Sequence, residues 1–510
     1  MKETFKHSRK TESGVSLKAV MLLMAVVLLP IHGEAQRLLT LDSCRAMALR
    51  NNKQMSVAKV KQDVNAHLQK SARTKYLPHV NALGGYVWTS KEISMLSEED
   101  KETLNGLGTN AAASLSGTIG SIVSQLPAAA QAQLAQGVSQ FAGSLDQVGA
   151  GLVNAMRTDT RNMFAGAVTV TQPVFMGGAI TAANKIADIN VEMAANSLEL
   201  KRQGTLYNID QAYWQVVSLR QKQKLAESYV SLVKKLKSDV QKMIDQGVGT
   251  KGDGLSVSVR VNEAEMALTQ VTDGLALSKM LLCQLCGLPV NENITLADEE
   301  VEGLNVNSEG YAAGGPSLAM QNRPELKVLQ NTVDLTKQTT NMLKAGNLPQ
   351  VLVTGGYAVS NPNTFNGFEK KFGGFWNVGV LVRVPVWNWG DVKHKVRASK
   401  GATTIANLEM EEARELIELQ VNQSNFKVNE AQKKLTMAQA NVANADENLR
   451  MANLAFKEGT ASFTTVMEAQ TAWQQAQTQK IDAEIGVKLS EVELQKALGT
   501  LQKKNGVITK

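Results

Sequence analysis

The stretch WNVGVLVRV, residues 376–384, decides the fold. Its valines and tryptophan occupy every second position, an alternation that is typical of a β-strand with one apolar face. The stretch FAGAVTVT, residues 164–171, has a similar alternation, and residues 80–89 and 351–360 supply two further segments of about ten residues. Because roughly 9–11 tilted residues cross a bilayer as a barrel strand, these segments predict four membrane strands.

Aromatic residues lie near the ends of these segments, as in the girdles of a membrane barrel: Tyr86, Trp88, Tyr357, Trp387 and Trp389. Four strands are too few to close a barrel, and open sheet edges do not face lipid. Several chains must therefore share one barrel. Two copies give eight strands and three give twelve, and the periodicity does not choose between them. A soluble sheet packed on helices is the alternative interpretation.

The chain contains two halves of similar design. Positions 212 residues apart carry matching residues: Pro173 and Pro385, Gly178 and Gly390, Gly247 and Gly459. Further upstream, residues 51–87 match residues 322–358 at an offset of 271. We interpret this as a tandem duplication. Because the offset falls from 271 to 212, the first half carries 59 extra residues between Tyr86 and Phe164.

Long helices follow the strands in each half. A heptad seam of Val, Ala, Leu and Phe runs from Val428 to Phe456, and no Pro interrupts residues 386–500. Residues 178–247 and 390–459 each predict a helix of roughly 100 Å at 1.5 Å per residue. Each helix turns through a Gly- and Thr-rich tip into a returning helix. The sequence therefore predicts long antiparallel coiled-coil helices; a plain coiled-coil spacer is the alternative.

The chain begins with the features of a secretory signal peptide. Basic residues precede the apolar run 19–30, and Gly33 and Ala35 fit a signal-peptidase site. An uncleaved anchor is the alternative, although a run of about 12 is short for a span of about 20. We expect a signal peptide at 1–35 and a first repeat at 36–287. A linker at 288–316, a second repeat at 317–499 and a tail at 500–510 follow.

The 59 extra residues predict two helices. Residues 103–156 hold one charged residue, Asp146. Apolar residues recur at helical spacing on either side of Pro127: Leu115, Ile119, Ile122 and Leu126, then Leu134, Val138, Phe141, Leu145, Val148 and Leu152. Because this insert joins two barrel strands, we expect two amphipathic helices on the extracellular side that cap the outer end of the barrel.

These features together resemble the TolC-like outer-membrane efflux channels. The resemblance rests on the duplicated order of elements and on NRPEL at 322–326, YLP at 76–78, NLP at 347–349, LCGLP at 285–289 and ALG at 497–499. It implies an all-α protein with a membrane β-barrel portion, assembled as a homotrimer with a 12-stranded barrel in outer-membrane lipid and a 12-helix periplasmic tunnel.

The resemblance also implies the function and partners. An inner-membrane efflux pump and a periplasmic adaptor dock on the hairpin tips, and cargo of a tripartite efflux or type I secretion-like system leaves passively. A periplasmic adaptor or coiled-coil tether of an export complex is the alternative function.

The candidate site lies at the two hairpin tips, which contain Gly247, Gly249, Thr250, Gly459 and Thr460. In the family, an Asp on the first hairpin meets a Tyr and an Arg on the second. The resemblance places Asp253 and Phe456 at the first two positions, but Ala461 stands at the third. The ionic half of this lock is therefore missing, and a helix N-cap is the alternative role of Asp253.

Glu468 is a second candidate position at this end of the hairpins. Thr465 and Glu468 fall where the family carries its lumen aspartates. Glu468, repeated in three copies, is expected to form a cation-attracting ring; a solvated helix face is the alternative.

Other chemistry has little support. The formal net charge of +7 is small and dispersed, so it does not indicate a nucleic-acid partner. His67, His79 and His394 have no metal-binding spacing, and no catalytic arrangement stands out, so we expect no enzyme activity, cofactor or metal. Cys283 and Cys286 form CxxC at the end of an apolar helix, where a packing role is expected.

Overall fold

The computed structural model describes residues 37–92, 94, 96–124, 127–157, 159–301, 303, 315–367 and 369–501. The predicted signal peptide, residues 1–35, lies outside these residues. So do residues 304–314 of the predicted linker and 502–510 of the predicted tail. The chain forms two compact units. As far as the structure describes them, we call residues 63–194 and 329–409 the sheet unit, and residues 37–62, 195–328 and 410–501 the helical unit.

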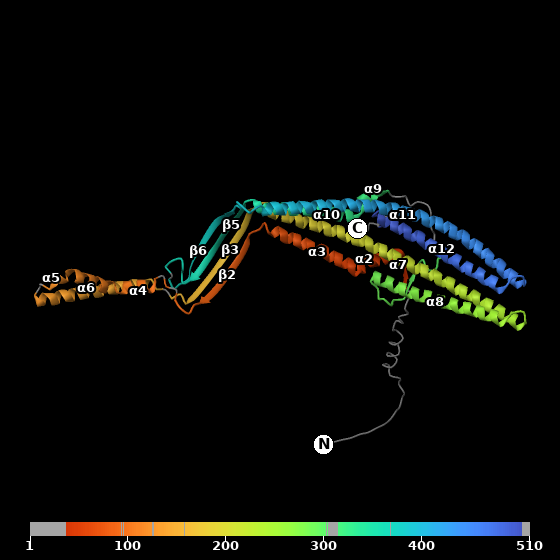
Figure 1. The fold of residues 1–510 in the computed structure, drawn as a ribbon, viewed down its shortest axis with the longest axis horizontal. Helices are drawn as coiled ribbons and strands as arrows, with labels where there is room; N and C mark the ends of the chain where they lie inside the picture. The colour runs from red at the N-terminus through yellow and green to blue at the C-terminus, as the bar shows by residue number, and fades with distance from the viewer. Residues whose placement is uncertain are drawn as a thin grey trace, which may run out of the picture. The chain divides into compact units, whose positions relative to one another are not determined.

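The sheet unit contains all four predicted strands. They are β2 (His79–Trp88), β3 (Asn162–Met176), β5 (Gln350–Asn361) and β6 (Gly373–Arg383). They form one antiparallel sheet in the order β2-β3-β5-β6 (Figure 1). Among the described residues, β2 and β6 are therefore its edges.

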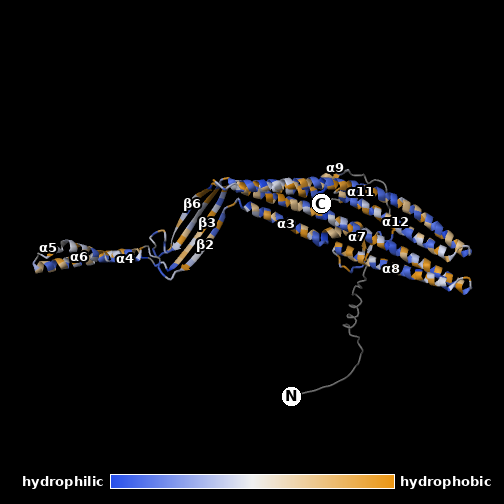
Figure 2. Ribbon diagram, in the orientation of Figure 1, coloured by the Kyte–Doolittle hydropathy of each residue, from blue (hydrophilic) through white to orange (hydrophobic). Residues whose placement is uncertain are grey.

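The register separates an apolar face from a mixed face. Ala82 lies opposite Val168, Val168 opposite Tyr357, and Tyr357 opposite Trp376. Because side chains alternate along a strand, these residues share one face. That face carries Val80, Tyr86, Trp88, Phe164, Val170, Val351, Val353, Val378, Val380 and Val382. The other carries Asn81, Leu83, Gly85, Ala165, Ala167, Thr169, Thr171, Thr354, Gly356, Asn377, Gly379 and Arg383. Figure 2 shows the hydrophobic residues along the strands in orange.

Among the described residues, three helices lie between β2 and β3: the two that the sequence predicts and one more. They are α4 (Glu98–Asn105), α5 (Leu107–Val123) and α6 (Ala128–Ala155). The missed helix α4 is highly charged and has no apolar face, and a capping box between Ser97 and Asp100 begins it. Leu126 of the predicted stripe lies outside the described residues.

Glycines bring these three helices into close contact. A Cβ at Gly149 of α6 would lie 1.8 Å from the carbonyl oxygen of Leu104, and one at Gly108 of α5 would lie 1.9 Å from that of Ala142. Only glycine fits at either crossing. The low-complexity insert is therefore a packed helical element and not a flexible loop.

Two helices of equal length follow the sheet strands. These are α7 (Ala179–Asp245) and α11 (Asp391–Lys457), each with 67 residues. The returning helices are α8 (Lys251–Cys286) and α12 (Phe463–Ala497). None of the described helices combines the length and the apolar composition that a membrane crossing requires.

Left-handed backbone positions recur 212 residues apart. The pairs, with their φ angles, are Gly177 (61°) and Trp389 (52°), Gly178 (84°) and Gly390 (80°), Gly247 (77°) and Gly459 (72°), and Gly287 (73°) and Gly499 (67°). Seven of these eight residues are glycine, which adopts this conformation without steric penalty. The chain thus turns in the same way before and after the corresponding helices of both halves.

The remaining elements are shorter. Strand β1 (Arg37–Leu39) pairs in parallel with β4 (Ile294–Leu296). The other helices are α2 (Leu41–Asn51), α3 (Lys53–Thr74), α9 (Pro316–Asn322), α10 (Pro324–Lys344) and the 3-10 turn η1 (Ala345–Asn347).

A buried core in the helical unit holds α2, α7, α8 and the β1–β4 pair together. Tyr213, Ile209 and Leu282 are fully buried there. The guanidinium of Arg45 donates to both carboxylate oxygens of Asp210, at 2.7 and 2.6 Å. Lys279 donates to Glu299 at 3.1 Å and to the carbonyl oxygen of Ile294 at 3.0 Å, which fastens β4 to α8.

The three cysteines belong to this core. Cys44, Cys283 and Cys286 are fully buried, and none forms a disulfide. Burial raises the pKa of the Cys283 thiol. Within the described ranges, no three His, Cys, Asp or Glu side chains gather as a metal-binding group. The burial agrees with the predicted packing role of CxxC.

Candidate functional site

The first hairpin tip is a tight glycine turn between α7 and α8. The N–H of Gly247 donates to the carbonyl of Ile244 at 3.0 Å, and the N–H groups of Val248 and Gly249 share the carbonyl of Met243 at 2.9 and 3.1 Å. These bonds satisfy the last carbonyls of α7. At Gly249 a Cβ would lie 3.1 Å from the side chain of Ile244, so this position favours glycine.

The second tip repeats this pattern 212 residues later. Gly459 donates to the carbonyl of Phe456 at 3.1 Å, and the N–H groups of Thr460 and Ala461 share the carbonyl of Ala455 at 2.9 and 3.2 Å. The Thr460 hydroxyl also donates to Ala455, at 3.0 Å. Phe456 is therefore the structural counterpart of Ile244, and both close the end of a long helix.

Thr250, and not Asp253, is the N-cap of α8. The Thr250 side chain accepts from the N–H of Asp253, and the Asp253 side chain accepts from the N–H of Thr250. Asp253 is thus the third residue of the helix and closes a capping box. The alternative role considered for Asp253, as the cap itself, is wrong by three residues. Its carboxylate nevertheless accepts a backbone hydrogen bond at the beginning of the helix.

A hydrophobic cluster lies behind both tips. Its fully buried members are Val233 of α7, Val257 of α8 and Val466 of α12, and Leu449 of α11 joins them. Half-buried Phe456 packs against this cluster. The two hairpins are therefore held together by apolar contacts behind the turns. Phe456, which has no polar side-chain atom, contributes to these contacts.

Glu468 lies on the exposed surface of α12, one turn after the helix begins. In the part of the chain that the structure describes, it has no ion-pair partner. Its carboxylate is thus available to solvent or to an approaching cation. The structure places Glu468 near the second tip, with Asp253 at the first.

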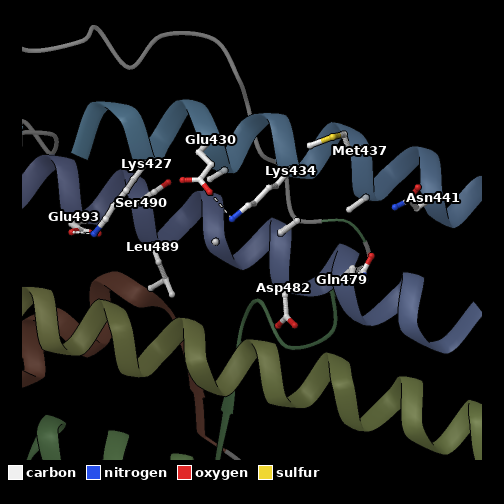
Figure 3. A pocket seen from close by; sticks show the side chains of 14 residues that line it. Lys427, Glu430, Lys434, Met437, Asn441, Gln479, Asp482, Leu489, Ser490 and Glu493 are labelled. Atoms are coloured by element: carbon white, nitrogen blue, oxygen red, sulfur yellow. Dashed lines mark hydrogen bonds and ion pairs between the residues drawn. The ribbon is translucent and has the colours of Figure 1, made fainter. Parts of the chain in front are cut away.

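Sequence reasoning missed a groove of about 680 Å³ between α11 and α12 (Figure 3). Lys427 donates to Glu493 across its wall at 2.6 Å, and Lys434 pairs with Glu430 at 2.7 Å. Small residues, including Ala438 and Gly486, also line it. The lining of the groove thus combines small residues with charged ones. The sequence signal for it was the run of small residues at facing heptad positions.

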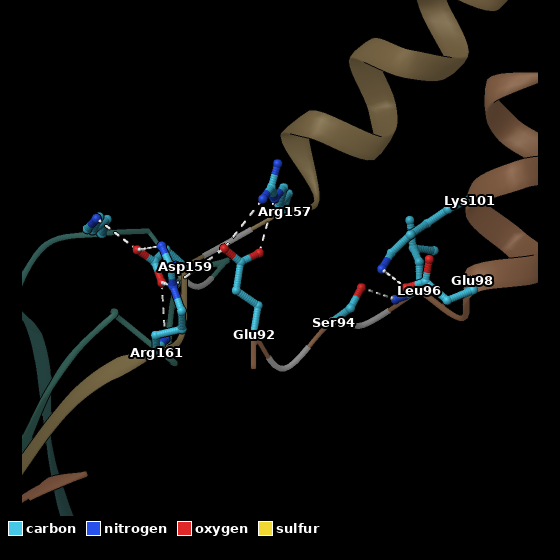
Figure 4. A network of polar contacts seen from close by, with 9 residues as sticks. Glu92, Ser94, Leu96, Glu98, Lys101, Arg157, Asp159 and Arg161 are labelled. Carbon is cyan, nitrogen blue, oxygen red and sulfur yellow. Dashed lines mark hydrogen bonds and ion pairs between the residues drawn. The ribbon is translucent and has the colours of Figure 1, made fainter. Parts of the chain in front are cut away.

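A polar network at the base of the insert was also missed (Figure 4). Arg161 donates to both carboxylate oxygens of Asp159, at 2.9 and 3.1 Å, and Arg157 donates to Glu92 at 3.1 Å. Lys370 donates to Asp159 at 3.3 Å. Hydrogen bonding from Arg161 holds the pKa of Asp159 well below its usual range. These contacts fasten the ends of the insert beside the sheet.

Comparison with known proteins finds a matching family and curated relatives. The sequence pattern of the family described as "Outer membrane efflux protein" matches residues 45–288 and 315–500. Outer membrane efflux protein BepC of Brucella suis biovar 1 (strain 1330) is 23% identical over 270 residues, which cover 52% of this chain and 57% of BepC.

Protein CyaE of Bordetella pertussis (strain Tohama I / ATCC BAA-589 / NCTC 13251) is 22% identical over 251 residues, which cover 49% of this chain and 52% of CyaE. The matches thus span about half the length of these curated relatives.

The fold has relatives among solved structures. The CmeC outer membrane channel of Campylobacter jejuni superposes with a TM-score of 0.70 at 12% identity, covering 90% of this chain and 86% of that one. At this identity the likeness concerns the fold alone.

Proposed function

Since this chain belongs to the outer membrane efflux protein family, we propose that three copies form a passive export channel. The family places the protein in the outer membrane, with its helical tunnel in the periplasm, and the fold is that of channel proteins. In our proposal an inner-membrane pump and a periplasmic adaptor deliver cargo to the tunnel, in a tripartite efflux or type I secretion-like system.

One observation carries the proposal: the sheet has an apolar face and two edges that no described strand pairs with. Its strands of 10 to 15 residues are long enough to cross a bilayer. The edges, β2 and β6, leave backbone groups unpaired that lipid does not hydrogen-bond. Pairing of β6 from one copy with β2 of the next satisfies these groups. The apolar face then contacts lipid and the mixed face lines the bore.

Three copies suit conduction better than two. In a barrel of about eight strands, side chains fill the interior, so a pair of chains would leave little passage. Twelve strands enclose a wider bore. Small residues on the mixed face, such as Ala167, Gly356 and Gly379, widen it further. A trimer therefore pairs all the sheet edges and also leaves an open channel.

The two repeats contribute the same kinds of element to each copy. We assign residues 36–287 and 317–499 to them, joined by the linker 288–316. Each repeat supplies two strands and one helical hairpin, so that three copies give twelve tunnel helices. The hairpin tips, with Gly247, Thr250, Gly459 and Thr460 at their surface, form the docking end for the adaptor. Glu468 adds three carboxylates to this end.

The proposal is tested with protein purified in detergent. We expect light scattering to give the mass of three chains, and planar bilayers to show stable single-channel conductance. A single-chain mass without conductance would overturn the proposal. Protein that stays soluble without detergent and binds a separate outer-membrane channel would instead fit the alternative adaptor.

A further inference from the structure

The exposed side of α6 carries a heptad seam that none of the described residues covers. Apolar and small residues are spaced by three and four along it: Leu134, Gly137, Phe141, Ser144, Val148 and Gly151. All six are exposed, and the side chains of Phe141 and Val148 are 59% and 56% exposed. A spacing of 3.5 residues marks a helix that packs on a parallel or antiparallel partner as a coiled coil.

The other faces of α6 are already accounted for. Ala142 and Gly149 are buried against α5 and α4. Amides lie beside the seam, at Gln140, and further around the helix, at Gln136, and both are exposed. The predicted apolar stripe therefore divides: Val138 and Leu145 are half-buried beside the first face, whereas Phe141 and Val148 belong to the seam. Leu134, which begins the seam, also lines the groove beside α5.

Two glycines of the seam indicate a close neighbour. A Cβ at Gly137 or Gly151 would meet nothing within 4 Å, in contrast to the crowded Gly149. A glycine inside a helix costs about 1 kcal/mol relative to alanine, and no contact with the described residues requires these two. Close approach of another helix backbone gives them a role, since small residues at an interface let helices pack tightly.

Charge indicates which neighbour this is. Asp146 is the one charged residue between 103 and 156. Its carboxylate accepts from the N–H groups of Gly108 and Thr109 at 2.7 and 3.0 Å and from the Thr109 hydroxyl at 2.6 Å. The six seam residues carry no charge for an oppositely charged partner to recognise, and uncharged seams of identical copies do not repel one another. A further copy of the same helix is a partner that needs no opposite charge and does not repel the seam.

We propose that the α6 helices of three copies pack along this seam as a parallel three-stranded coiled coil outside the membrane. The inference rests on the proposed trimeric channel. Rotation about a threefold axis keeps the chain direction, so the three helices run parallel. Layers of Leu134, Phe141 and Val148 alternate with layers of Gly137, Ser144 and Gly151. The small layers bring the backbones together and the large side chains fill the axis.

Disulfide trapping tests the seam. Ser144→Cys places three thiols around the axis, and Gln136→Cys places them further around the same helix. A disulfide forms only when Cα atoms come within about 7 Å. The native cysteines are buried and do not compete. After mild oxidation of the detergent-purified protein, we expect Ser144→Cys to lose most of its single-chain band to a linked pair on a non-reducing denaturing gel. Gln136→Cys is expected to keep its single-chain band.

The mass of each sample by light scattering separates this inference from the channel proposal. A trimeric mass with no Ser144→Cys link, or with equal linking of both variants, overturns the seam and leaves the channel proposal standing. A mass other than three chains overturns both. Linking of Ser144→Cys alone in a trimer supports the seam, and the same sample heated in reducing agent must return to single chains.

Discussion

Thr250 and Asp253 bind each other's backbone at the beginning of α8. The Thr250 hydroxyl oxygen accepts the N–H of Asp253 at 3.2 Å, and Oδ2 of Asp253 accepts the N–H of Thr250 at 2.9 Å. The second hairpin has only half of this arrangement. There Ser462 accepts the N–H of Thr465 at 3.4 Å, but Thr465 has no carboxylate with which to return the bond.

This capping box predicts that Asp253→Ala changes the channel conductance little. The carboxylate acts within its own hairpin, and neither Phe456 nor Ala461 offers it a polar side-chain partner. Thr250→Ala is the matched control, because it breaks the same box and keeps the charge. Each substitution should cost about 1 kcal/mol of helix stability. A large rise in single-channel conductance for Asp253→Ala but not for Thr250→Ala would show that the charge closes the bore.

The topology of the channel predicts opposite labelling of its two ends. Val248 is 69% exposed at the first tip, and Ser139 is exposed on α6. Single cysteines at these positions should react differently with a membrane-impermeant maleimide in intact cells. We expect Ser139→Cys to be labelled at once and Val248→Cys only after the outer membrane is permeabilised. The reverse order would invert the orientation.

The close helix crossing in the insert predicts a strong effect of a single methyl group. Gly149→Ala would place a Cβ 1.8 Å from the Leu104 carbonyl oxygen, so α4 and α6 must move apart. Overpacking of this kind costs about 1–3 kcal/mol. Gly143→Ala is the control, because its Cβ would meet nothing. Thermolysin should cleave the insert faster in Gly149→Ala only. Equal cleavage of both variants would contradict the tight crossing.

Asp146 predicts acid sensitivity at the beginning of α5. Hydrogen bonds, the largest effect being that from the Thr109 hydroxyl, lower the pKa of Asp146 from its ordinary value of 3.8. A carboxyl with a lowered folded pKa stabilises the fold above its ordinary pKa and loses this effect as the pH falls through the folded value. Exchange of the Gly108 and Thr109 amide hydrogens, corrected for intrinsic rates, should therefore speed up in acid. The same pH dependence in Asp146→Asn would exclude Asp146 as its cause.

Burial predicts that the three cysteines do not react in the folded protein. Each thiol is inaccessible, and the raised pKa of Cys283 further reduces its reactive thiolate at neutral pH. A maleimide should modify none of them at pH 7 and all three after denaturation, as counted by mass spectrometry. The exposed cysteine of Val248→Cys serves as the positive control. Modification of Cys283 in the folded trimer would show that the core opens.

The strands were predictable because an alternating apolar face is a local pattern, but their ends depend on neighbours. Strand β3 continues through Pro173 to Met176, although Pro cannot donate a ladder hydrogen bond. The pairing with β2 ends where His79 meets Thr171, so Pro173 has no partner strand on that side. On the side of β5, the pairing shifts its register between Pro173 and Phe175, and this irregularity accommodates the proline. None of this is visible in one segment alone.

Signals for the missed features were present but weak. Ser97-Glu-Glu-Asp100 and Thr250-Lys-Gly-Asp253 are both capping-box patterns, and reading them would have found α4 and the N-cap of α8. The division of the α6 residues between a buried and an exposed face was not readable, because both faces are apolar and small. Only the position of α5 separates Ala142 from Phe141.

The pairing of β1 with β4 imposes an order of events on secretion. Arg37 lies opposite Ile294, so the first strand of the folded chain has no partner until more than half of the sequence has crossed the inner membrane. Closing so long a loop is entropically costly and slow. Until then Leu39, which is buried in the finished core, remains exposed to water as apolar surface. The N-terminal part of the newly exported chain therefore cannot complete its core before the middle of the chain arrives.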